Sequence, residues 1–210
     1  MNWIDSGFLL SKNKINENSV IAEIYTENHG KSSGIIFGAS SKKIKSYLEI
    51  GNLLHVNYSS KSPEKIGSFK IEISKANTAY FFENKIKLHC IISTMNLIRI
   101  LTVENQSNKN LYNLINIFFE NIKLDKWLKV YILWELQLYK VLGYNLNLKD
   151  LVQKEEQNGT TNYFVISNNE KKNIPSFLVN EQNEDQDIRK NDLFNAIKIL
   201  KDFLEKSILG

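Results

Sequence analysis

Ser19–Thr26 reads Ser-Val-Ile-Ala-Glu-Ile-Tyr-Thr, an alternating and β-branched run that is typical of a half-buried β-strand. Four further apolar runs of similar length lie around it in the N-terminal part of the chain. They cover residues 7–11, 33–37, 53–58 and 69–73. Polar segments at 12–18, 28–31 and 40–45 separate them and are expected to be loops. Five short strands with lysine-bearing loops predict a small closed or partly open β-barrel.

Positive charge is concentrated in this β-module. Residues 1–80 hold ten lysines against seven acidic residues, whereas the rest of the chain is nearly balanced. Small β-modules with a basic surface commonly bind single-stranded nucleic acid. Lysine lacks the planar fork with which arginine reads guanine edges, so we expect little sequence preference. The closely spaced Lys42, Lys43 and Lys45 either contact phosphate or only solvate a loop.

The hydrophobic period changes near Thr78, which marks the expected boundary between a β-domain, 1–78, and a helical domain, 79–210. Apolar residues recur at helical spacing over 88–101, 111–122, 124–142 and 193–208. Between the last two helices, 163–167 is a candidate strand and 180–191 is a charged linker. The predicted fold class is therefore α+β, with a five-stranded barrel followed by an all-α domain.

Aromatic residues in both halves allow two interpretations. Trp127, Tyr131 and Trp134 have the spacing of a helix face, which indicates a core more often than a peptide-binding pocket. In the β-module, aromatic side chains could instead stack on bases if they face outward. The residues concerned are Phe37, Tyr47, Tyr58 and Phe69. The sequence alone does not assign all of them to a face of the barrel.

Catalytic and metal-binding motifs are missing from the sequence. The single cysteine, Cys90, excludes an intramolecular disulfide and a cysteine-rich zinc site. Gly30-Lys31-Ser32 resembles the end of a P-loop, but Tyr25 stands where the first glycine is required. We therefore expect no metal, no cofactor and no enzymatic activity. The N-terminus lacks a signal-like pattern and no apolar run approaches the roughly 20 residues of a membrane span, so a cytoplasmic location without membrane contact is expected.

Spaced residues form an ordered pattern along the first 150 positions. In the β-module they are Trp3-x-x-x-Gly7-x-Leu9-Leu10, Glu17-x-Ser19, Thr26-x-x-x-Gly30, Gly38-Ala39, Leu48-x-x-Gly51 and Ile66-Gly67. In the helical half they are Trp134-Glu135-Leu136 and Leu142-Gly143-Tyr144. Together with the order of strands and helices, this pattern resembles the family of the bacterial DNA repair protein RecO.

The resemblance implies an OB-fold domain, a helical domain and a role as a recombination mediator in DNA repair. Members bind single- and double-stranded DNA, anneal complementary strands and engage RecR. They also bind the acidic C-terminal tail of single-stranded DNA-binding protein, which helps a recombinase to displace it. DNA contacts are then expected at Lys12, Lys14, Lys31, Lys42, Lys43 and Lys45, and partner contacts at Lys126, Trp127 and Lys129.

Two features depart from the family pattern. The cysteine cluster of many members would begin near Leu151, but residues 151–159 contain no cysteine. We therefore expect a degenerate, metal-free hairpin near 151–178, with Asn158-Gly159 as its turn. Ile132 and Leu133 stand where an arginine is expected beside the tail-binding groove, which leaves Lys126 and Lys129 as the nearest substitutes. The alternative function is a non-catalytic protein-interaction adaptor that acts through the helical domain.

Overall fold

The computed structural model describes residues 1–62, 65–144, 148, 152–157, 160–167, 170–179 and 188–208. The chain divides into two compact units, Met1–Asn116 and Ile117–Gly210. The first unit thus contains helical residues as well as the strands that precede them. The domain boundary expected at residue 78 stays a prediction.

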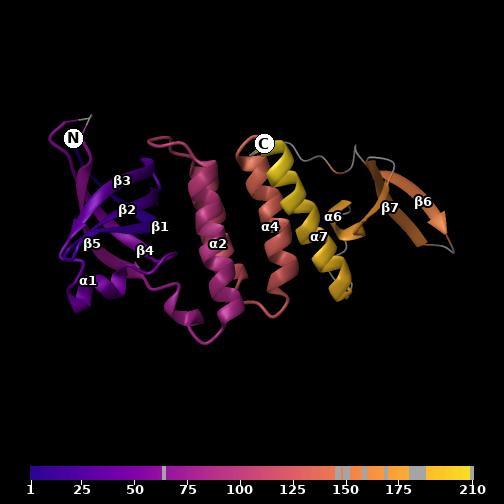
Figure 1. Cartoon of the computed structure of the whole chain (residues 1–210), viewed down its shortest axis with the longest axis horizontal. Coiled ribbons are helices and arrows are strands. Elements are labelled where there is room, and N and C mark those ends of the chain that lie inside the picture. The colour runs from indigo at the N-terminus through magenta and orange to yellow at the C-terminus, as the bar shows by residue number, and fades with distance from the viewer. Residues whose placement is uncertain are drawn as a thin grey trace. The chain divides into compact units, whose positions relative to one another are not determined.

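Five strands of the first unit close into a barrel, shown in indigo and purple in Figure 1. They are β1 (Asn2–Asn16), β2 (Ser19–Thr26), β3 (Gly30–Phe37), β4 (Leu53–Ser59) and β5 (Gly67–Lys75). Around the barrel the order is β1-β2-β3-β5-β4, and β4 pairs again with β1. All pairs are antiparallel except β3 and β5, which pair in parallel. This topology is that of an OB-fold and confirms the predicted five-stranded barrel.

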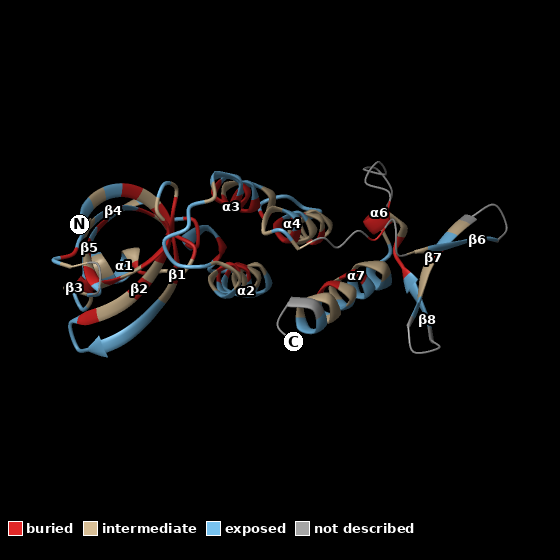
Figure 2. Cartoon of the chain, turned by 90° about the horizontal axis from the view of Figure 1, so that it is seen from above, coloured by how far each residue is buried: buried red, intermediate tan, exposed pale blue. Residues whose placement is uncertain are grey.

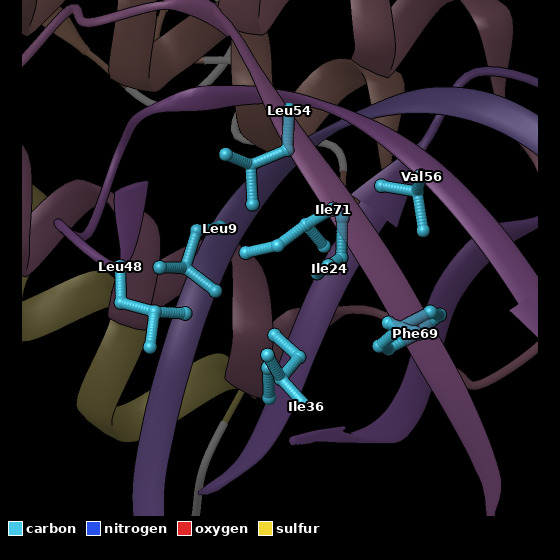
Figure 3. Packing of buried hydrophobic residues seen from close by; sticks show 9 residues of the cluster. Leu9, Ile24, Ile36, Leu48, Leu54, Val56, Phe69 and Ile71 are labelled. Atoms are coloured by element: carbon cyan, nitrogen blue, oxygen red, sulfur yellow. The ribbon is translucent and has the colours of Figure 1, made fainter. Parts of the chain in front are cut away.

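The barrel interior is filled by every second residue of the strands, as the alternating pattern predicts. Figure 3 shows this packing, in which side chains from all five strands and from Leu48 meet. The buried residues are Leu9, Ala22, Ile24, Ile36, Leu48, Leu54, Val56, Phe69 and Ile71. Phe69 is 2% exposed, so it belongs to the core and cannot stack on a bound base.

Two segments expected to be loops are regular structure instead. Residues 12–16 continue β1, because they pair with β2 in a hairpin that joins Lys14 to Val20 and Asn16 to Ser19. Most of the predicted basic loop 40–45 belongs to the short helix α1 (Lys42–Tyr47). The Ser41 side chain caps this helix by accepting a hydrogen bond from the backbone N–H of Ile44 at 3.3 Å.

Helices complete the first unit. A 3₁₀ turn, η1 (Ala79–Phe81), leads into α2 (Lys85–Leu101), and α3 begins shortly before the end of the unit (Lys109–Asn121). Asn84 caps α2, and α2 packs against β1. From α3, the Tyr112 ring lies 5.4 Å from the Phe8 ring on β1. Burial raises the pKa of Tyr112 to about 12, with a further contribution from the carboxylates of Glu27 and Asp5.

The second unit combines helices with a small sheet. Besides the end of α3, the helices in its described residues are α4 (Trp127–Val141), α6 (Ser176–Val179), α7 (Lys190–Phe203) and a terminal π-helical turn, η2 (Leu204–Ile208). α4 packs against α7, where the rings of Tyr139 and Phe203 lie 5.4 Å apart. The predicted core position of Trp134 is confirmed, since its side chain is buried beside Phe118.

A three-stranded antiparallel sheet occupies the region where a hairpin was expected. Its strands are β6 (Gln153–Gln157), β7 (Thr160–Ser167) and β8 (Glu170–Ile174), in that order. β6 and β7 form the predicted hairpin, although its expected Asn158-Gly159 turn lies outside the described residues. The third strand, β8, was not predicted, because its sequence is charged and lacks an apolar alternation. Part of the expected linker 180–191 also lies outside the described residues.

Candidate nucleic-acid interface

Three of the six predicted DNA-binding lysines line one groove at the α1 end of the barrel. The groove has a volume of about 440 Å³. Its walls come from the β1–β2 hairpin and from the segment that runs from the end of β3 into α1. They are formed by Lys12, Lys14, Asn16, Glu17, Val20, Ala39, Ser40, Lys45 and Leu48. The barrel thus brings together lysines that are more than 25 residues apart in the sequence.

Hydrogen bonds hold the two walls of this groove in place. Lys12 Nζ donates to the carbonyl oxygen of Leu48 and lies 3.7 Å from Glu49 Oε1. Ala39 N–H donates to the carbonyl oxygen of Asn18 at 3.1 Å. These contacts fix the β1–β2 hairpin against the chain on either side of α1, so the groove exists before any ligand binds.

The lysines of α1 belong to a helix that has no buried residue, as the burial colouring of Figure 2 shows. Lys42, Lys43 and Lys45 are all exposed, and in the described part of the chain no hydrogen bond or ion pair engages their ammonium groups. Ile44 and Tyr47 pack against the barrel core, which leaves the lysines on the outside of the helix. An exposed lysine without a partner can neutralise a phosphate at little cost.

Lys31 occupies a different environment from the other candidates. It is 8% exposed, and its Nζ donates to the carbonyl oxygens of Arg99, at 2.7 Å, and Thr102. These carbonyls belong to the C-terminal end of α2, where a cation also interacts favourably with the helix dipole. Such contacts favour a structural role for Lys31, which joins α2 to the barrel. The DNA-binding proposal therefore depends on the other five lysines, of which Lys12 is more exposed than Lys31 but also donates to a carbonyl oxygen and lies beside Glu49.

The segment after α2, residues 102–108, lies along the edge of β3 near its start, and we call it the strap. Glu104 pairs with Lys31 in a parallel β-bridge, and Asn105 N–H donates to the Lys31 carbonyl oxygen at 2.8 Å. Ser33 Oγ donates to Glu104 Oε1 at 2.6 Å. Just before the strap, Arg99 Nη1 lies 3.2 Å from Glu23 Oε2. The strap side of the β2–β3 face is thus closed by paired polar groups.

The other half of the β2–β3 outer face is partly exposed, although Ser19 within it is buried, and we call it the open half. Register pairs Ile21 with Ile35 and Ser19 with Phe37, and members of each pair point to the same side of the sheet. Ile21 and Ile35 are half-buried, and Phe37 is 64% exposed. The groove lies on the other side of the sheet, because Lys12 and Lys14 pair with the core-facing residues Ala22 and Val20.

A stack of rings lies at the opposite end of β1. The Trp3 ring stacks on His29 at 4.2 Å and on Tyr58 at 4.7 Å between centroids. Asp5 accepts hydrogen bonds from His29 Nδ1 and from the Asn28 backbone N–H, both at 2.9 Å. Burial alone would raise the pKa of Asp5, but these bonds outweigh it and hold the pKa below its ordinary value. His29 belongs to the segment 28–31, which was expected to be a loop. The sequence around it does not indicate its hydrogen bond with Asp5.

The comparisons with known proteins agree with the fold. The family model described as "Recombination protein O N terminal" matches residues 1–76, and the one described as "Recombination protein O C terminal" matches residues 84–192. The chain belongs to the RecO family of DNA repair proteins. The resemblance drawn from the spaced residues of the sequence is confirmed.

Over the aligned segment, curated RecO proteins are about one third identical to this chain. The DNA repair protein RecO of Rickettsia canadensis is 34% identical over 148 residues, which cover 70% of this chain and 61% of that protein. The Wolbachia protein is 31% identical over 150 residues, covering 70% and 62%. The chain therefore spans about three fifths of the length of the RecO proteins it matches. Among solved structures, Entamoeba histolytica asparaginyl-tRNA synthetase aligns over 79% of this chain and 40% of its own, at 14% identity and a TM-score of 0.29, which is too low to support any inference.

The RecO partner residues predicted in the helical half lie at the start of α4. Lys126 is exposed and precedes the first residue of the helix, Trp127, which is half-buried like Lys129. Ile132 is fully buried and Leu133 is half-buried. Neither position therefore presents a side chain fully to a partner, and the assignment of Lys126, Trp127 and Lys129 stays a prediction.

The zinc cysteines found in many RecO proteins are missing from this chain, which has only Cys90. Among the described residues, no three His, Cys, Asp or Glu side chains are close enough together to hold a metal ion. Of the helices that the structure describes, none combines the length and the hydrophobicity needed to cross a membrane.

Proposed function

We propose that this RecO-family chain is a DNA-binding recombination mediator. It anneals complementary single strands and helps a recombinase to load onto DNA that is coated with single-stranded DNA-binding protein. The observation that carries this proposal is the gathering of Lys12, Lys14 and Lys45 around one groove of an OB-fold barrel, next to the exposed Lys42 and Lys43. OB-folds use such basic grooves to follow a nucleic-acid backbone.

The proposed mechanism is electrostatic and needs no covalent step. Each lysine that neutralises a phosphate releases a condensed counterion, so binding is favoured by entropy and weakens as salt rises. A surface that neutralises two strands also lowers the repulsion between them. Complementary strands that are held together in this way can pair. Because lysine contacts the phosphates and not the base edges, we expect little sequence preference.

The proposed protein partners are RecR and the acidic C-terminal tail of single-stranded DNA-binding protein. For the tail, Lys126 and Lys129 would pair with its carboxylates, and Trp127 would form an apolar wall. Support comes from membership of the family and from the position of these residues at the start of one helix. A tail peptide should bind the wild-type chain and lose affinity for the double variant Lys126→Gln/Lys129→Gln, which isothermal titration calorimetry can measure.

The DNA-binding function is tested with fluorescence-monitored annealing of two complementary oligonucleotides coated with single-stranded DNA-binding protein. The wild-type chain should accelerate annealing, and the acceleration should weaken at higher salt. The triple variant Lys42→Gln/Lys43→Gln/Lys45→Gln should lose most of this acceleration. In a binding titration, its slope of log affinity against log salt should be shallower by about 2, since each phosphate contact on single-stranded DNA contributes about 0.7.

A second triple variant controls for net charge. Lys85→Gln/Lys109→Gln/Lys198→Gln removes the same charge from exposed positions outside the groove and should anneal like the wild type. Equal losses in both triple variants would show that only net charge matters and that the groove is not the site. No acceleration by a folded wild-type chain would contradict the mediator function and favour the adaptor alternative, which partner pull-downs would then examine.

A further inference from the structure

The groove at the α1 end of the barrel has the volume of a small-ligand site and an apolar floor. Its volume of about 440 Å³ lies within the range of roughly 300–1,000 Å³ that is typical of ligand pockets. The floor belongs to the barrel core, since Leu48 is a member of the buried cluster and Val20 and Ala39 pack against it. Neutralising phosphates requires no apolar surface, whereas the flat face of a base gains from covering it. The groove therefore offers a place for a nucleoside as well as for a phosphate.

Free positive charge in the groove comes from one lysine on each wall. Lys14 on the β1–β2 hairpin and Lys45 on α1 are both exposed, and within the described residues no hydrogen bond or ion pair engages either ammonium group. Lys12 is different, because its Nζ donates to the Leu48 carbonyl oxygen and lies 3.7 Å from Glu49 Oε1. Two free ammonium groups on opposite walls can bind the same phosphate, each with a charge-assisted hydrogen bond. This pair of lysines is the expected position of a phosphate.

The end of the groove at the hairpin tip is polar and carries a negative charge. Asn16 and Glu17 line it on the hairpin side, and Ser40 lines it on the α1 side. Ser40 Oγ donates a hydrogen bond to Asn18 Oδ1 at 2.6 Å, which ties the two sides together. The Glu17 carboxylate repels a phosphate, but it can accept a hydrogen bond from a hydroxyl group. A strand that passes the two free lysines is therefore favoured to end here rather than to continue.

We infer that the groove binds a hydroxyl end of single-stranded DNA. The last phosphate lies between Lys14 and Lys45, the terminal nucleoside covers the apolar floor, and its free hydroxyl donates to Glu17. From that phosphate the strand leaves along α1, where Lys42 and Lys43 are exposed outside the groove lining. An end held in this way leaves the remaining bases free to pair. This inference rests on the proposed function and adds to it a preferred part of the strand, an end that is not phosphorylated.

The test uses the full chain and four oligo-dT strands of one length that carry an internal fluorophore. They have hydroxyl groups at both ends, a phosphate at the 3′ end, a phosphate at the 5′ end, or phosphates at both. In anisotropy titrations the doubly phosphorylated strand should bind about 5-fold more weakly than the hydroxyl-ended one, the effect of one exposed charge contact. Added negative charge otherwise strengthens binding to a basic surface, so the sign of the difference is decisive. The singly phosphorylated strands identify which end enters the groove.

Three variants assign the end preference to the groove. Glu17→Gln should abolish it, because the neutral amide no longer repels a terminal phosphate. Ala39→Leu should also abolish it, by filling the floor without a change of charge. Lys42→Gln/Lys43→Gln should weaken binding of all four strands and keep the preference. Glu83→Gln is the matched control for Glu17→Gln, since Glu83 is exposed outside the groove, and it should bind every strand like the wild type.

The outcomes separate this inference from the proposed function. Equal affinity of the wild-type chain for hydroxyl-ended and phosphate-ended strands, or tighter binding of the phosphorylated ones, would overturn the inference. A preference that survives in Glu17→Gln would also overturn it, because the carboxylate would then not face the terminal hydroxyl. Annealing without an end preference would overturn the inference alone, whereas an end preference without annealing would support it and contradict the proposed function. A wild-type chain that binds no strand would overturn both.

Discussion

The two halves of the β2–β3 face use the same two strands and differ in what covers them. Near the start of β3, the strap pairs with the strand and Lys31 is buried against the end of α2. Near the end of β3, Phe37 is exposed, and so are Lys42, Lys43 and Lys45 on the following helix α1. The comparison teaches that the same two strands can be covered by the rest of the chain at one end and exposed at the other, so only the exposed end is available to the proposed ligand. The following predictions test this difference, in order of decreasing effect on stability.

The largest effect is expected from Gly30→Ala, because Gly30 has a φ of +67° and an added Cβ would lie 2.0 Å from the Gln106 carbonyl oxygen in the strap. Backbone strain and this clash together should lower the free energy of unfolding by roughly 3–5 kcal/mol. Gly38→Ala is the control, since Gly38 has a similar φ of +74° but open surroundings. The Gly38→Ala variant should lower the free energy of unfolding by only about 1–2 kcal/mol, which urea unfolding measures. Equal losses of unfolding free energy in the two variants would mean that the close approach of the strap to Gly30 does not restrict this position.

Lys31→Met should lower the free energy of unfolding by about 2–3 kcal/mol, because it removes the donor for two carbonyl oxygens at the end of α2. The methionine keeps most of the aliphatic stem. DNA affinity per folded molecule should stay at the wild-type level, measured under conditions in which both proteins are folded. A variant that is stable but binds DNA weakly would place Lys31 in the DNA interface and erase the contrast between the two halves.

Asp5→Asn tests the turn that leads into the strap side, since Asp5 holds Asn28 and His29 just before Gly30. The free energy of unfolding should fall by about 1–2 kcal/mol at pH 7. The pKa of Asp5 is lower in the folded chain than in the unfolded one, so its stabilisation is present at neutral pH and is lost as the pH falls below about 4. Urea unfolding of both proteins between pH 3 and pH 7 should show the difference shrinking with acid. A constant difference would assign the effect to packing.

The smallest effect on stability is expected from the triple glutamine variant of Lys42, Lys43 and Lys45. These side chains are exposed on a helix with no buried residue, so the free energy of unfolding should change by less than about 0.5 kcal/mol. Thermal unfolding followed by circular dichroism measures this directly. A large destabilisation would show that the open half is also structural, and the loss of DNA binding could then not be assigned to phosphate contacts.

Much of the fold was predictable from the sequence, because the barrel strands alternate and the helices have an apolar period. The extension of β1 was not, since residues 12–16 are mostly polar and are held by hairpin pairing alone. The helix α1 was missed because six residues are too few to show a period. Its apolar anchors, Ile44 and Tyr47, become visible as such only when the barrel is known.

The sequence predicted that lysines would form the candidate site, but it did not predict which of them lie together. Clustering of Lys12, Lys14 and Lys45 depends on contacts between segments that are distant in the sequence. The burial of Lys31 depends on the end of α2, some 70 residues away. Lysines with and without such partners look alike in a sequence, which explains why Lys31 was grouped with the others.

The parallel pairing of β3 with β5 has a consequence for how the domain folds. It consists of two residue pairs, Gly34 with Gly67 and Ile35 with Ser68, whereas each of the other strand pairings within the barrel has seven or eight. A short ladder between distant residues forms after the long hairpins and opens before them. We therefore expect the barrel to open first along this line. Among the strand amides, those at this seam should exchange their hydrogens for deuterium soonest.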